Sequence, residues 1–193
     1  MENPVLLHSQ FTESIYERLT LLGQCIFAAT CCRRLLPLFS PKAEGRNQEV
    51  GEFLLNSTWA WVSGLADQPS NIDIAPLIQG DEDAEDAEEV FQATLQFERL
   101  ICVLSGCPEE GKTIGYWNTA LLDNYLYRIR GWTINAENSI RIGNESLMLQ
   151  EVERQKRDLD LIVGAVNVEL VARNLWKDHE DEHILQHANI KDK

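Results

Sequence analysis

The sequence is short of the features that mark exported, membrane-spanning and nucleic-acid-binding proteins. Its first residues, MENPVLLH, have neither the basic start nor the long apolar core of a signal peptide, and no apolar run approaches the ~20 residues that span a bilayer. Its five cysteines are an odd number without a CxxC pair, which favours reduced thiols in the cytoplasm. Only 17 lysines and arginines stand against 31 aspartates and glutamates, so the formal charge of −14 disfavours nucleic acid and anionic membranes as partners.

Strand patterns are also missing, because nowhere do four to eight residues alternate between apolar and polar beside turn residues. Apolar residues instead recur every three or four positions, which is the spacing of one face of a helix. Five such stretches occur, over about 11–36, 50–65, 90–104, 113–131 and 147–170. The length of 193 residues, 44% of them hydrophobic, suits one domain. We therefore predict an all-α fold, a single compact bundle of five to seven helices over residues 1–193, with a polar C-terminal tail from about residue 177.

The body of the chain lacks histidine, which is the commonest general base. The four histidines all lie near the ends of the chain and are His8, His179, His183 and His187. No GxSxG turn is present, and no pair of carboxylates lies in an apolar pattern that would separate their pKa values. We therefore expect no catalytic residue, no cofactor and no enzyme activity.

Residues 106–113, GCPEEGKT, match the phosphate-binding pattern GxxxxGK[ST]. The residues that would bind a nucleotide in such a loop are Gly106, Gly111, Lys112 and Thr113. The loop needs a buried strand before it, whereas residues 90–104 keep a helical period up to the first glycine. Pro108 also removes one N–H donor, and two glutamates bring negative charge. We favour a helix end followed by a short turn, and keep a nucleotide-binding phosphotransferase or NTPase as an alternative.

Residues 179–183, HEDEH, fit the zinc-protease pattern HExxH, and His187 follows four residues later. A catalytic zinc helix lies in the core beneath a cleft, whereas this segment belongs to the polar tail and has little apolar surface to bury. We therefore predict no metal site and expect a solvated tail, with adventitious metal capture by the three histidines as the alternative.

Residues 81–89, DEDAEDAEE, hold seven carboxylates in nine positions. The spacing lacks the alternating ligands and central glycine of a calcium-binding EF-hand loop. Two interpretations stay open, a solvated helix start and a negative surface that docks a basic protein. The residues that we expect to bind such a partner are Asp83, Glu85, Asp86, Glu88 and Glu89.

Three short segments carry a family resemblance. They are FAATCCRRLLP at 27–37 with Phe39, LNSTW at 55–59, and Gln150-Glu151 with Gln155 and Leu159. Their residues resemble helices of the bacterial YjaG-like family, a domain of unknown function, and the spacing is compatible over about 45–165. The resemblance implies a compact helical fold with a helix-turn-helix around residues 106–113. It supplies no catalytic residues, because none are established for the family.

Taken together, these observations lead us to expect an acidic, cytoplasmic, helical binding protein. In its most specific form, it is an inhibitor or immunity-type protein that neutralises a basic partner such as a toxin domain. A helical signalling adaptor or a homodimer, with exposed aromatic surface near Trp59, Trp61 or Trp132, is a further alternative.

Overall fold

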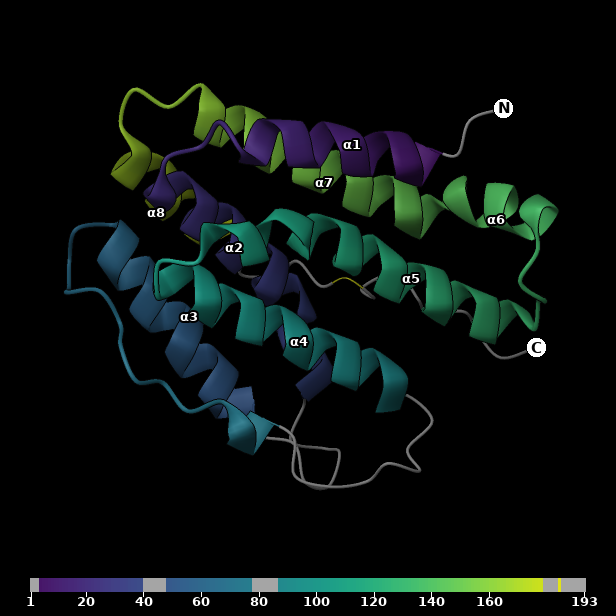
Figure 1. Ribbon diagram of the computed structural model, residues 1–193, viewed down its shortest axis with the longest axis horizontal. Helices are drawn as coiled ribbons and strands as arrows, with labels where there is room; N and C mark the ends of the chain where they lie inside the picture. The colour runs from purple at the N-terminus through teal and green to yellow at the C-terminus, as the bar shows by residue number, and fades with distance from the viewer. Residues whose placement is uncertain (1–3, 40–47, 78–86, 179–183, 185–193) are drawn as a thin grey trace.

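The computed structural model describes residues 4–39, 48–77, 87–178 and 184 (Figure 1). Over those residues the chain forms eight α-helices and three short 3-10 helices, and it contains no strand. The α-helices are α1 (Pro4–Tyr16), α2 (Leu21–Leu35), α3 (Gln48–Val62), α4 (Ala87–Leu104), α5 (Ile114–Arg130), α6 (Ala136–Gly143), α7 (Ser146–Val163) and α8 (Val168–Asp178). The 3-10 helices are η1 (Leu36–Phe39), η2 (Ala75–Leu77) and η3 (Pro108–Thr113). The all-α prediction is confirmed, while the number of helices in the described ranges exceeds five to seven.

Two predicted helices are each divided in the structure. The stretch 11–36 is broken between α1 and α2 because Thr20 starts a new helix, with its Oγ1 accepting a hydrogen bond from Gly23 N at 3.2 Å. The stretch 147–170 is broken at Gly164, which ends α7 before α8 begins. An apolar stripe continues across both breaks, so the apolar period alone does not mark them.

The remaining stretches are close to their predicted positions. The predicted helix over 90–104 is α4, and the predicted helix over 113–131 is α5, which ends at Gly131 in the left-handed conformation (φ 61°). The eight-residue helix α6 was not predicted. It begins after Asn135, whose side chain accepts a hydrogen bond from the backbone N–H of Asn138 at 2.9 Å.

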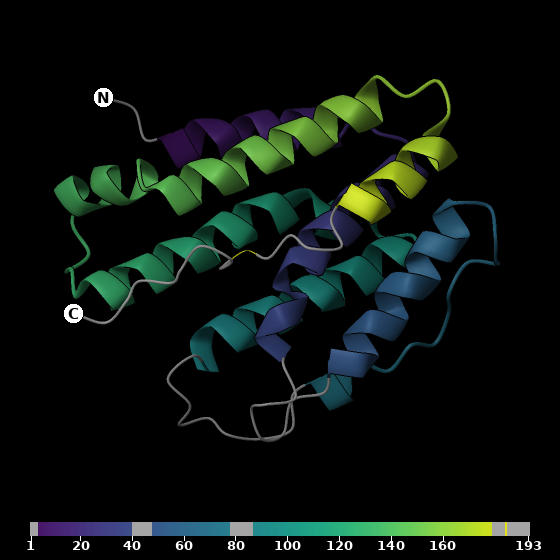
Figure 2. The same ribbon diagram turned by 180° about the vertical axis from the view of Figure 1, so that it is seen from behind.

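Helix α2 is the centre of the packing. It contacts α3, α4, α5, α7 and α8, and eleven of its fifteen residues are buried. Figure 1 shows α1 and α7 side by side along one edge of the molecule, with α3 and α4 towards the opposite edge. Figure 2 shows α8 lying against α2 and α3 from behind. Because α2 is surrounded, any polar side chain on its buried faces must find its partners inside the protein.

The apolar stretch that contains α2 is longer than expected from the sequence. Among the described residues, the continuous helical segment Leu21–Phe39 has the length and composition of a membrane span, with 19 residues and a mean hydropathy of 1.2. The expectation that no apolar segment approaches this length is therefore wrong. In the fold 72% of its most apolar window is buried, and the core helix of a soluble protein passes the same test of length and composition.

The predicted start of the polar tail, at about residue 177, lies at the end of helix α8. Helix α8 extends to Asp178, and Leu175 on it is fully buried. Ile184, the one described residue beyond this helix, is also buried and donates its backbone N–H to Arg34 O at 3.0 Å. The chain after residue 177 thus adds at least one apolar side chain to the core.

Candidate functional site

The GCPEEGKT motif follows a helix in this structure. Helix α4 continues to Leu104, as the helical period predicts, so no strand precedes the motif. Gly106 ends the helix with φ +89°, and its N–H donates to Val103 O at 3.1 Å while Cys107 N–H donates to Cys102 O at 2.9 Å. These bonds satisfy carbonyl groups at the helix C-terminus. The geometry favours the interpretation of a helix end over that of a phosphate loop.

The second half of the motif packs against α1. A Cβ atom on Gly111 would lie 2.0 Å from the Tyr16 hydroxyl oxygen, and that hydroxyl donates to Pro108 O at 3.1 Å. Lys112 forms an ion pair with Glu17. Thr113 directly precedes α5 and makes no side-chain cap bond. Two of the four residues that would bind a nucleotide, Gly111 and Lys112, therefore join η3 to α1 instead.

The run of carboxylates at 81–89 is only partly described. Asp83, Glu85 and Asp86 lie outside the described residues. Glu88 is exposed and accepts a hydrogen bond from Gln92 Nε2 at 2.7 Å. Glu89 is 2% exposed, so the expectation that it belongs to a solvent-facing docking surface is wrong.

The burial of Glu89 has a simple geometric cause. It lies one helical turn before the buried residue Ala93 and two turns before Gln96, so the helix period turns it inward. Its carboxylate accepts hydrogen bonds from Arg128 Nη2 at 2.9 Å and Nε at 3.1 Å. A buried carboxylate needs such a partner.

The HEDEH segment at 179–183 and His187 also lie outside the described residues. Across the part of the chain that the structure does describe, no group of three or more metal-ligating side chains comes together. His8, the histidine of α1, is instead buried in a polar cluster that the sequence did not reveal.

This cluster surrounds Arg34 of α2, which has no exposed surface. Its Nη1 donates to Asp158 Oδ2 at 2.9 Å, and its Nη2 and Nε donate to Glu151 Oε1 at 3.0 and 3.2 Å. Both carboxylates come from α7 and are also fully buried. Burial alone would disfavour the charge of Arg34, but the Glu151 and Asp158 carboxylates hold its pKa above the usual value.

Neutral side chains extend the cluster towards α1. Gln155 Nε2 donates to Glu151 Oε1 at 2.8 Å and to Gly115 O at 3.0 Å, so the Gln155 side-chain oxygen is free to accept from His8 Nε2 at 2.9 Å. Thr12 Oγ1 lies 3.2 Å from the same histidine nitrogen. Burial outweighs the bond to Gln155 and lowers the pKa of His8, so the neutral imidazole is favoured.

Two surface cavities of the described residues lie apart from both the cluster and the GCPEEGKT motif, beside which a smaller one of about 220 Å³ is lined by Glu17 and Lys112. One, of about 340 Å³, lies between α3 and α8 beside Trp59 and Trp176, whose ring centroids are 5.3 Å apart, with Arg173 and Lys177 also lining it. It could hold a small apolar group that carries a negative charge.

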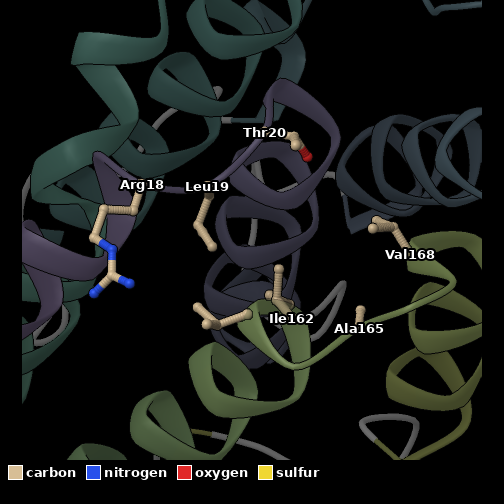
Figure 3. Close-up of a pocket in the computed structure, with 7 residues that line it drawn as sticks. Arg18, Leu19, Thr20, Ile162, Ala165 and Val168 are labelled. Carbon is tan, nitrogen blue, oxygen red and sulfur yellow. The ribbon is translucent and has the colours of Figure 1, made fainter.

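The other cavity, of about 300 Å³, lies where the α1–α2 turn meets the α7–α8 turn. Figure 3 shows Leu19 and Ile162 near its middle, with Arg18 and Val168 to either side. Its lining includes one ionisable side chain, Arg18, so it offers shape and apolar surface rather than acid–base chemistry.

The arrangement of helices has a counterpart among solved structures. The chain is similar to a DUF416 family protein from Shewanella baltica OS155, with a TM-score of 0.72 and 20% sequence identity over 86% of this chain and 92% of that chain. The chain has the DUF416 fold. The YjaG-like family is the same family, so the resemblance seen in the sequence is confirmed at the level of the fold. No protein-family model matches the sequence, and no curated protein matches it.

The segments that carried the resemblance build the centre of this DUF416 fold. Residues 27–37 belong mainly to α2, residues 55–59 to α3, and Glu151 with Gln155 to α7. Two of these segments supply the buried ion cluster, through Arg34 on α2 and the side chains of α7. Together they contribute to the core.

Proposed function

We propose that this chain is an acidic binding protein, an inhibitor or immunity-type protein that neutralises a basic protein partner in the cytoplasm. The observation that carries the proposal is the distribution of charge along the chain. Residues 47–98, which we call the acidic segment, contain twelve aspartates and glutamates and no lysine or arginine. Such separation of charge creates a surface that attracts cations over a longer range than interleaved charges do.

Most described acidic side chains of this segment reach solvent. The exposed ones are Glu49, Asp67, Asp73, Glu88 and Glu98. They lie on α3, on α4 and in the connection between them, and Figures 1 and 2 both show these two helices on the same side of the molecule. The exposed carboxylates thus come from two helices on the same side of the fold and from the connection between them.

Arg128 pairs with Glu89 inside the acidic segment, but other cations of the described chain pair with acids outside it. Arg130 pairs with Glu145 at 3.1 Å and Lys156 pairs with Glu153 at 3.0 Å, both within α5–α7 and the turn between α6 and α7. These pairs neutralise acids outside the acidic segment. The segment itself keeps a negative potential that speeds association with a basic surface and disfavours acidic partners.

The position of the ionisable groups in the described residues also supports binding rather than catalysis. The cluster of Arg34, Glu151 and Asp158 could in principle move protons, but all three side chains are sealed in the core. Burial raises the pKa of the Cys25 thiol to about 12, which disfavours the thiolate that a nucleophile needs. A basic toxin domain has the surface chemistry that the acidic segment would capture.

A decalysine peptide is a suitable first probe, because it carries the positive charge of the proposed partner without its shape. Isothermal titration calorimetry compares the full chain with the variant Glu49→Gln/Asp73→Asn/Glu88→Gln. The matched control is Glu137→Gln/Glu153→Gln/Asp160→Asn, which removes three exposed carboxylates outside the acidic segment. Both variants change the net charge by the same amount.

We expect the first variant to bind decalysine more weakly and with a smaller dependence on salt, and the control to bind like the unmodified chain. Equal losses in the two variants would mean that binding follows net charge rather than the acidic segment, and the proposal would then be abandoned.

A further inference from the structure

The end of α4 brings two cysteines together. The hydrogen bonds from Cys107 N–H to Cys102 O and from Gly106 N–H to Val103 O, with the positive φ of Gly106, form the Schellman pattern of a helix C-terminus. In this pattern two residues lie close and their side chains often touch. One is two positions before the last helical residue, and the other is two positions after the cap residue. Here those two positions are Cys102 and Cys107.

The hydrogen bond also limits the distance between the two residues. Because Cys107 N lies 2.9 Å from Cys102 O, standard bond lengths keep the two Cα atoms within roughly 6.8 Å of each other. Disulfides in proteins join Cα atoms that are about 4.4–6.8 Å apart. The separation of the two Cα atoms is therefore within the range that a disulfide spans while the helix-end hydrogen bonds stay in place.

The pair differs from the other thiols in its access to solvent. Cys107 is exposed and Cys102 is partly exposed, whereas Cys25, Cys31 and Cys32 have no exposed surface. Burial, with the neighbouring Glu110 and Cys107, raises the pKa of the Cys102 thiol. The exposed Cys107 is thus the thiol that a dissolved oxidant meets first, and Cys102 is placed to react with it second.

We propose that Cys102 and Cys107 are a reversible oxidation site at which a hydroperoxide forms a disulfide across the end of α4. The Cys107 thiolate attacks one oxygen of hydrogen peroxide, which breaks the O–O bond and, with one proton, gives a sulfenic acid and water. The Cys102 sulfur then attacks the Cys107 sulfur and expels the hydroxyl group as a second water. Overall, two thiols and one hydrogen peroxide give one disulfide and two waters, and a dithiol reductant restores the thiols.

The disulfide would fix the turn that leads into η3. This short helix carries Gly111 and Lys112, which join it to α1 through Tyr16 and Glu17. A covalent link from α4 to the residue before η3 would therefore hold this corner of the fold together even when its hydrogen bonds open. Reversible stabilisation of a surface turn is the physical effect that oxidation would have.

Tryptic peptide mapping of the full chain tests the proposal, because cleavage after Arg99 and Lys112 places both cysteines in the single peptide 100–112. The reduced protein is treated with hydrogen peroxide, and the remaining thiols are blocked with iodoacetamide. We expect peptide 100–112 to lose two hydrogens, about 2 Da, to resist alkylation, and to regain both thiols with dithiothreitol. Peptide 19–33, which carries Cys25, Cys31 and Cys32, serves as the internal control and should stay reduced.

The variant Cys102→Ser separates the two steps. Without the second thiol, we expect Cys107 to remain as a sulfenic acid that dimedone labels, and the loss of two hydrogens to disappear. Three results would each overturn the proposal: an unmodified peptide 100–112, oxidation of its cysteines to sulfinic acid without a disulfide, or a disulfide that joins it to peptide 19–33 or to a second copy of the chain.

Discussion

Replacing Arg34 with methionine tests whether its charge holds the buried cluster together. Methionine is unbranched and fills similar space, so the change mainly removes the guanidinium. The carboxylates of Glu151 and Asp158, which it now contacts at 2.9–3.2 Å, would remain buried without it. Removing one partner of a buried ion pair costs about 3–5 kcal/mol. In a chain of this length, that loss lowers the melting temperature by about 6–20 °C.

The pH dependence of the loss identifies its cause. If the destabilisation comes from unpaired negative charge, protonation of the buried carboxylates relieves it. The folded variant then binds protons at a pH at which the unfolded chain has already released them. Stability of Arg34→Met should therefore increase relative to the unmodified chain as pH falls from 7.5 to 5. Urea denaturation followed by circular dichroism at both pH values measures this difference.

Two further variants separate charge from packing. Arg130→Met removes a cation whose pair with Glu145 is partly exposed, and we expect a loss below about 1 kcal/mol with no pH effect. Arg34→Met/Glu151→Gln/Asp158→Asn removes all three charges, and we expect it to regain more than half of the stability lost by the single variant. A single variant that loses less than about 1 kcal/mol, or a triple variant no more stable than the single one, would refute the reasoning.

Three other predictions follow from the same contacts. Gly111→Ala should destabilise the chain by about 1–3 kcal/mol in urea denaturation, since a Cβ there would lie 2.0 Å from the Tyr16 hydroxyl of α1. Titration of the unmodified chain with magnesium-ATP should release no heat, because Gly111 and Lys112 already contact α1. Glu89→Gln should cost about 1–3 kcal/mol because Arg128 loses a charged acceptor, whereas Glu88→Gln should change stability by less than about 0.5 kcal/mol. His8→Gln should flatten the fall in melting temperature below about pH 6.5, because burial lowers the pKa of His8 from 6.5 and the unfolded chain therefore takes up the proton first.

The apolar period predicted α4 most closely. Helix α4 buries residues such as Val90, Phe97 and Leu100 at helical spacing while exposing Glu98, and its limits were predicted within three residues. The helix boundaries near Thr20 and Gly164 were not predicted, because apolar residues continue through both. At the first, a single side-chain hydrogen bond decides where the new helix begins.

The buried ion cluster was beyond the reach of sequence analysis for a different reason. On α7 the residues Glu151, Gln155 and Asp158 are spaced by four and three positions, so they share one face with the apolar stripe. That spacing is a usable signal, since polar residues on a buried stripe need internal partners. Their cation lies more than a hundred residues earlier in α2, however, and only the folded chain reveals which arginine it is.

In the GCPEEGKT motif, backbone geometry and packing explain the residues that a phosphate-binding loop would also require. Gly106 is needed because its φ of +89° disfavours any side chain, although a Cβ there would meet open space. Gly111 is needed for the opposite reason, since its backbone angles are ordinary but Tyr16 leaves no room for a Cβ. Lys112 already faces the carboxylate of Glu17. A nucleotide phosphate would have to displace that carboxylate and approach a turn that also carries Glu109. The two glycines and the lysine are therefore better explained by the packing of helices against one another than by the binding of an anion.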